Sequence, residues 1–373
     1  LLWMRKGEFA KAEAHFRTAI KTLTQRNPNP YDGEPYFNLG WSCRMQGKID
    51  EAYDAFYKAA WNAAWQDASY FEIARIETIR GEYEKALESV EKSLTRNWHH
   101  HKARQLKCSL LRKMKYNEKA VAFADASLEI DSFNMGCRYE RYLASGENSD
   151  LEKLKELMRD WSHGYIEYAL DFVAGGLYEE AAGLLGLYLQ DVEKVYPIIY
   201  YLLGYICMKQ SNPSLAQEYF VKAEKCDSAY CFPNRIEEVL ILQEAVRQNP
   251  SDAKSFYYLG NFWYASRRYE NAVSCWEQSA TIDPEFPTVW RDLSLAYYNK
   301  CNNREKAVAA LEKAFALDNT DARILMELDQ LYKKLGRSYA ERLTFLEKHV
   351  ALVESRDDLA LERITLYNQL GRY

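Results

Sequence analysis

Apolar residues recur along this chain at the spacing of one helix face. The first clear stripe consists of Tyr36, Leu39, Gly40 and Cys43. A second, later stripe of the same kind consists of Phe256, Leu259, Gly260 and Trp263. Steps of three and four residues place side chains on one side of a helix. After a short turn that often contains glycine, a further stripe begins, formed in the first case by Ala52, Phe56 and Ala59. The pattern therefore predicts pairs of helices.

These helix pairs repeat at a fixed interval. Gly47 and Gly81 stand 34 positions apart, and so do Tyr36 and Tyr70. A period of this size indicates a solenoid, in which each unit buries its apolar face only against its neighbours.

One unit carries the signature of a known family. The segment EPYFNLGWSCRMQGKIDEAYDAFYKAA has an aromatic-x2-Leu-Gly start and a later Ala-x3-Phe-x2-Ala run. It resembles a tetratricopeptide repeat, and the resemblance covers nearly all of the chain. The resemblance implies an all-α, right-handed superhelix of about ten helix pairs, some of them irregular.

We expect a single solenoid over residues 1–373, with irregular units near 131–160 and 231–252 where the spacing departs from the period. Glycine alignments indicate that the chain opens partway through a first helix and stops before a second one. We therefore expect a piece of a longer protein, truncated within a repeat at both ends. Unpartnered apolar residues at those ends (Leu2, Trp3, Leu366 and Tyr367) would favour end-to-end self-association.

Composition narrows the functional classes. The net charge of −5 argues against a nucleic-acid binder, whose binding face is normally basic. No run of apolar residues approaches the length of a membrane span. The eight cysteines are scattered through helical patterns, which favours free buried thiols and a reducing, cytoplasmic compartment.

Searches for catalytic spacings return no nucleotide-binding, hydrolase or zinc-protease motif. Cys226 and Cys231 lack the second ligand pair that a tetrahedral metal site needs. The consecutive His99, His100 and His101 are interpreted as solvated residues between helices. We therefore expect a chain without enzymatic activity, cofactor or metal.

Aromatic residues supply the candidate ligand site. The family resemblance implies that first-helix residues one, five and eight positions after the first aromatic line the concave face; we call these the concave-face positions. The candidate groove residues at these positions are Phe37, Trp41, Tyr201, Tyr205, Tyr257, Asn261, Tyr264, Arg291 and Tyr298. Tyrosine-rich surfaces suit peptide docking. In the alternative interpretation, a tight superhelix buries its own concave face and these residues only fill it.

Two functions follow as hypotheses. The leading one is a scaffold that binds a protein or peptide in the concave groove; clamping of a C-terminal carboxylate is not expected, because Phe37, Phe71 and Glu72 replace the basic residues of that variety. The alternative rests on a narrower resemblance to the repeat region of large bacterial proteins with an N-terminal β-sandwich domain. Segments such as RNWHHHKARQLKCSLLRK and CFPNRIEEVLILQEAV carry this resemblance. It implies an accessory region of a carbohydrate-active enzyme, which would reach carbohydrate through a catalytic domain that this chain lacks. A structural spacer is the third hypothesis.

Overall fold

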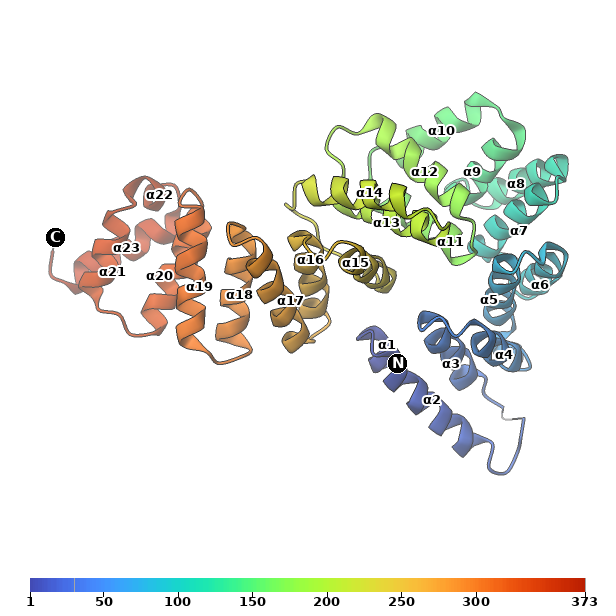
Figure 1. The fold of residues 1–373 in the computed structure, drawn as a ribbon, viewed down its shortest axis with the longest axis horizontal. Helices are drawn as coiled ribbons and strands as arrows, with labels where there is room; N and C mark the ends of the chain where they lie inside the picture. Colours follow the sequence, from blue (N-terminus) through green and yellow to red (C-terminus); the bar gives the residue numbers. More distant parts are fainter. Residues whose placement is uncertain (30, 373) are drawn as a thin grey trace. The chain divides into compact units, whose positions relative to one another are not determined.

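The computed structural model describes residues 1–29 and 31–372, and every regular element within them is a helix (Figure 1). This confirms the all-α fold of stacked helix pairs expected from the sequence. Pro30, in the connection before the first complete repeat, and Tyr373, the last residue of the expected solenoid, lie outside the described residues.

The chain forms two compact units, Leu1–Ala229 (unit 1) and Tyr230–Tyr373 (unit 2). Each unit is a series of paired helices. The single solenoid over the whole chain stays a prediction.

Unit 1 contains seven helix pairs among its described residues. They are α1 (Leu2–Arg5) with α2 (Phe9–Leu23), α3 (Glu34–Met45) with α4 (Ile49–Ala59), α5 (Gln66–Ile79) with α6 (Tyr83–Arg96), α7 (His101–Lys113) with α8 (Asn117–Ile130), α9 (Met135–Ser145) with α10 (Asn148–Met158), α11 (Ser162–Ala174) with α12 (Tyr178–Asp191), and α13 (Pro197–Lys209) with α14 (Pro213–Lys225). A short 3-10 turn, η1 (Ala63–Trp65), precedes α5. Helices α9 and α10 have only 11 residues each.

Unit 2 begins with a helix that has no first partner. Helix α15 (Ile236–Gln248) follows a segment, residues 226–235, that contains no helix. The remaining helices are α16 (Ala253–Ala265), α17 (Tyr269–Ile282), α18 (Pro287–Asn299), α19 (Arg304–Leu317), α20 (Ala322–Lys334), α21 (Tyr339–Glu347), α22 (Val350–Glu354) and α23 (Asp357–Gln369).

A close approach between a glycine and an aromatic ring sets the spacing within several pairs. A Cβ atom added to Gly40 would lie 2.6 Å from the Phe56 ring, and one added to Gly204 would lie 2.4 Å from the Phe220 ring. Both distances are shorter than real Cβ contacts allow. The aromatic residue stands 16 positions after the glycine in each case, so the second helix returns its ring to the gap that the glycine leaves.

The glycines of the 34-residue period have a different role. Gly47 and Gly81 occupy the turns between the two helices of a pair, with φ of 75° and 74°. Glycine adopts this left-handed region without the steric cost that a Cβ brings. Lys115 and Ser211 occupy the equivalent turns with φ of 65° and 60°, so the turn geometry persists where glycine does not.

Replacing Gly204 by Ala tests the close approach. The added methyl group has to push the Phe220 ring aside, and such overpacking costs about 1–3 kcal/mol of stability. Gly186, inside α12, is the matched control because nothing lies within 4 Å of an added Cβ there. Gly186→Ala should leave stability unchanged or raise it by up to about 1 kcal/mol, the helix preference for alanine. Urea unfolding followed by circular dichroism measures both; equal stability of the two variants would contradict the packing account.

Candidate functional site

The candidate groove residues of unit 1 are mostly packed. The Phe37 ring lies 5.4 Å from the Phe56 ring and 4.9 Å from that of Trp65, measured between centroids. Trp41 packs against the same apolar cluster. Tyr201 is 0% exposed. Tyr205 is half-buried, and the Lys209 ammonium lies 5.0 Å from its ring centre.

In unit 2, Tyr257 is also enclosed, with 3% of its surface exposed. Its hydroxyl donates to Asp292 over 3.2 Å, and burial raises the pKa of this carboxyl to about 6. The half-buried Asn261 accepts a hydrogen bond of 3.1 Å from the indole of Trp276. Both residues therefore belong to the packing between helices.

The other three candidate residues of unit 2 keep part of their surface exposed. The Tyr264 ring packs on Trp276 with a centroid distance of 5.4 Å. Arg291 donates from Nε to a Glu327 oxygen over 2.7 Å. The Lys334 ammonium lies 5.3 Å from the centre of the Tyr298 ring.

The nine residues thus do not share one environment. Tyr201 and Tyr257 lack the exposed surface that stacking on a ligand requires. The alternative interpretation, in which such residues only fill the concave face, describes these two. The other seven candidates are partly accessible: Phe37, Trp41, Tyr205, Asn261, Tyr264, Arg291 and Tyr298. A ligand role for any of them is a proposal.

The sequence did not predict which side chains fill the concave face of unit 1. The 34-residue step assigns Phe71 and Arg75 of α5, and Gln105 and Ser109 of α7, to concave-face positions, and all four are buried. They meet α11, whose Asp171 carboxylate receives Arg75 over 2.8 Å and Lys102 over 2.9 Å. A cavity of only about 10 Å³ remains between these helices, roughly the space that one water molecule needs.

A second ion cluster lies beside the first. Arg112 of α7 donates to Glu140 of α9 over 2.6 Å and to Glu180 of α12 over 2.7 Å. Glu140 is fully buried, and this burial raises the pKa of its carboxyl. The sequence signal for both clusters is the presence of arginine at concave-face positions, where most units carry aromatic or small residues.

One of the three consecutive histidines differs from the solvated residues that the sequence led us to expect. His99 and His101 are exposed, but the His100 ring packs on Phe71 with a centroid distance of 4.5 Å. Its Nδ1 accepts a hydrogen bond of 3.2 Å from the backbone N–H of Ala103 and thereby caps α7. Burial lowers the pKa of His100. The sequence missed this role because neutral imidazole is an unusual helix cap.

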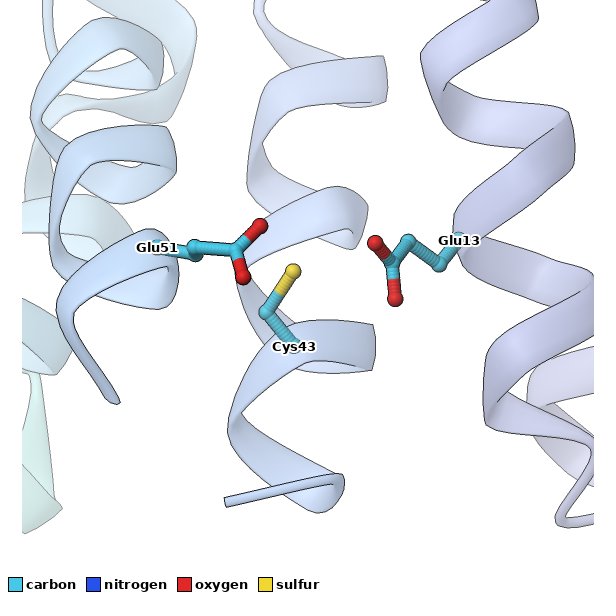
Figure 2. Close-up of side chains that lie close together, drawn as sticks. All are labelled: Glu13, Cys43 and Glu51. Carbon is cyan, nitrogen blue, oxygen red and sulfur yellow. The ribbon is translucent and has the colours of Figure 1, made fainter. Parts of the chain in front are cut away.

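Three side chains from neighbouring helices could be mistaken for a metal site. Figure 2 shows Glu13 of α2, Cys43 of α3 and Glu51 of α4 pointing toward one another, with candidate ligand atoms within 4.8 Å. The Glu13 carboxylate already accepts from Lys48 over 2.7 Å and from Arg17 over 2.8 Å.

Electrostatics also oppose a metal there. The hydrogen bond from Lys48 is the main cause that lowers the pKa of Glu13 to about 2, while burial raises the pKa of the Cys43 thiol. A metal ion would have to displace two bound cations and deprotonate a buried thiol. The cluster therefore fits a structural ion network rather than a metal centre. All eight cysteines are free thiols, five of them buried.

Comparison with known proteins identifies the repeats. Tetratricopeptide repeat family models match residues 2–69 and 241–288, and a second such model matches residues 198–230. The matched segments are tetratricopeptide repeats. The matches fall in both units, and the Gly40–Phe56 and Gly204–Phe220 contacts lie inside them. The narrower resemblance to bacterial proteins with a β-sandwich domain stays a prediction.

Solved tetratricopeptide repeat structures are similar at low identity. One is YrrB, described as a tetratricopeptide repeat protein with an unusual peptide-binding site. It is 21% identical to this chain, and the TM-score is 0.24. The match covers 65% of this chain and 98% of that chain. A tetratricopeptide repeat protein from Parabacteroides merdae shares 18% identity over 83% and 94% of the two chains, with a TM-score of 0.35. PilF of Pseudomonas aeruginosa shares 19% over 56% and 84%, with a TM-score of 0.33.

Among the described residues, no helix of these repeats combines the length and the apolar composition that crossing a membrane requires.

The His100 cap makes the stability of unit 1 sensitive to acid. Because the folded chain lowers the pKa of His100, the unfolded chain binds the proton more readily, and stability must fall as the pH drops. The contribution of His100 is fully present above about pH 6.5, the ordinary pKa of histidine, and is lost below it. His100→Asn keeps a capping acceptor that does not titrate. Melting temperatures between about pH 8 and about pH 5 should fall less steeply for this variant; parallel slopes for variant and wild type would contradict the assignment.

Proposed function

We propose that this chain is a non-catalytic scaffold and that unit 2 binds a peptide segment of another protein along its concave-face positions. Proteins built from tetratricopeptide repeats generally mediate protein–protein interactions. The candidate surface consists of Tyr264 on α16, Arg291 and Tyr298 on α18, and Glu327 and Lys334 on α20.

The observation that supports this proposal is the partial exposure of these side chains. Two concave-face residues of unit 1, Phe71 and Arg75, are by contrast buried beneath α11. Tyr264 and Tyr298 instead keep part of their rings accessible on successive first helices. Tyrosine offers an apolar body with a hydrogen-bonding tip, and it loses little conformational entropy when a partner covers it.

The charges of this surface indicate what kind of peptide it takes. The Arg291 guanidinium is already held by the Glu327 carboxylate through two donors. A carboxylate of the ligand would have to compete with Glu327 for this arginine. We therefore favour a peptide that contributes apolar or aromatic side chains to Tyr264 and Tyr298 over one that is recognised by its acidic groups.

A random peptide library displayed on phage and selected against the full chain tests this proposal. Selected peptides should bind the Tyr298→Ala variant at least about fivefold more weakly than the wild type, which corresponds to about 1 kcal/mol. Because Tyr298 is only half-buried, helicity and melting temperature should change little.

Tyr339→Ala is the matched control. It removes an exposed tyrosine of unit 2 that lies on α21, a second helix, and should leave the affinity unchanged. Selection of no peptide, or equal affinity of the selected peptides for the wild type and for Tyr298→Ala, would contradict the proposal.

A further inference from the structure

Unit 1 contains a junction between two groups of helices. The first block comprises α3 to α10 and the second comprises α11 to α14. Residues 159–161 join them, and this joint departs from ordinary backbone geometry. Arg159 has φ of 53° and ψ of −147°, a combination that side-chain-bearing residues rarely adopt, and the side chain of Trp161 is mostly exposed. Such a conformation persists only where the packing around it holds it, so loss of that packing would release the joint.

The blocks meet across the concave face of unit 1, where α11 lies beside α5 and α7 (Figure 1). Asp171 of α11 is the polar centre of this contact, which also includes the buried rings of Tyr139 and Phe172, 5.8 Å apart between centroids. One of its oxygens receives both Arg75, from α5, and Lys102, from α7. Only 11% of the Asp171 side chain is exposed, so solvent screens these ion pairs less than it screens surface pairs.

Further contacts also join cationic side chains of the first block to acceptor groups of the second block. Arg44 of α3 donates to the backbone carbonyl of Ala174, at the end of α11, and pairs with Glu72. Glu180 of α12 receives Arg112 over 2.7 Å and Lys113 over 2.6 Å, both from α7. We call these contacts, centred on Asp171 and Glu180, the ionic clasp.

The clasp has opposite charges on its two sides. The first block contributes five cations and only two carboxylates of its own, while the second block contributes the carboxylates that complete the network. The cations are Arg44, Arg75, Lys102, Arg112 and Lys113, and the carboxylates of the first block are Glu72 and Glu140. If the blocks separated, the face of α3, α5 and α7 would carry an excess of three positive charges.

We propose that this face is a second binding surface, for an acidic protein segment, and that α11 and α12 cover it as a built-in competitor. The carboxylates of the partner take the places of Asp171 and Glu180, and the joint at residues 159–161 absorbs the movement. The device is independent of the peptide surface proposed for unit 2, because all of its residues lie in unit 1. Separation of the blocks also exposes the buried Tyr139 and Phe172 rings, so the face stays closed until contacts with a partner offset that cost.

Distance measurements on the full chain test the clasp. Spin labels are attached at Glu88→Cys on α6 and Gln217→Cys on α14, two exposed positions on either side of the joint. Serine replaces Cys226, Cys275 and Cys301, the thiols that are not buried. Asp171→Lys places a third cation beside Arg75 and Lys102. The distance between the two labels should change from one narrow distribution to a longer and broader one. About 1 M salt, where the Debye length is about 3 Å, should change the distances of the wild type much less, because these ion pairs are buried.

The control is Asp125→Lys, which makes the same charge change. Asp125 pairs with Arg141 inside the first block and is half-exposed, so its distance distribution should match that of the wild type. Unchanged distances for Asp171→Lys would overturn the proposal. Should Asp171→Lys fail to fold, Asp171→Ala gives the same readout.

A labelled hexaglutamate peptide tests the binding surface. Asp171→Ala should bind it at least fivefold more tightly than the wild type, whereas Asp125→Ala, which removes an equal charge elsewhere, should not. Adding Arg75→Ala and Lys102→Ala to the Asp171→Ala variant should abolish the gain. Equal affinity of Asp171→Ala and Asp125→Ala would overturn the proposal even if the labels move, because the opened face would then not select acidic segments.

Discussion

The close approach of a small residue on the first helix to a side chain 16 positions later governs this structure. Gly260 and Trp276 repeat the relation found at Gly40 and at Gly204: an added Cβ would lie 2.3 Å from the indole. Where glycine is absent, the same two positions hold smaller partners, as with Cys108 and Ala124 in one buried cluster. Interiors are close-packed, so the volumes at these positions must be complementary. The helix pairs therefore keep their spacing although their side chains differ.

This constraint leaves the concave face free to vary. A helix pair is stabilised by its own contact and by its neighbours, and the part that the concave-face positions take differs from pair to pair. In unit 1, Arg75 and Arg112 meet carboxylates of α11 and α12, and the concave face of α5 and α7 is closed. In unit 2, Tyr264 and Tyr298 stay partly accessible, and the charge of Arg291 is satisfied within the same surface by Glu327. The same concave-face positions are thus covered in one part of the chain and partly accessible in another.

The sequence predicted the parts of the fold that depend on short spacings. The 34-residue period and the Gly40 and Phe56 positions sufficed for the all-α repeat fold, since both helices of a pair lie within one unit. The ion pair between Arg75 and Asp171 joins residues 96 positions apart, and no local pattern reports it. Tyr201 and Tyr205 have the same residue type and neighbouring concave-face positions, yet only one is enclosed. Exposure at these positions depends on which helices pack across the concave face. The repeat pattern of the sequence does not give this information.

The most direct test of a closed face in unit 1 and an accessible one in unit 2 is hydroxyl-radical footprinting of the full chain, read by mass spectrometry. Phe71, Phe172 and Tyr201 should be protected, at rates far below that of the exposed Trp98, because each is almost fully buried. Tyr298 should be oxidised at an intermediate rate. Oxidation of Phe71 and Phe172 as fast as that of Tyr298 would contradict the account, because α11 would then not cover the concave face of unit 1.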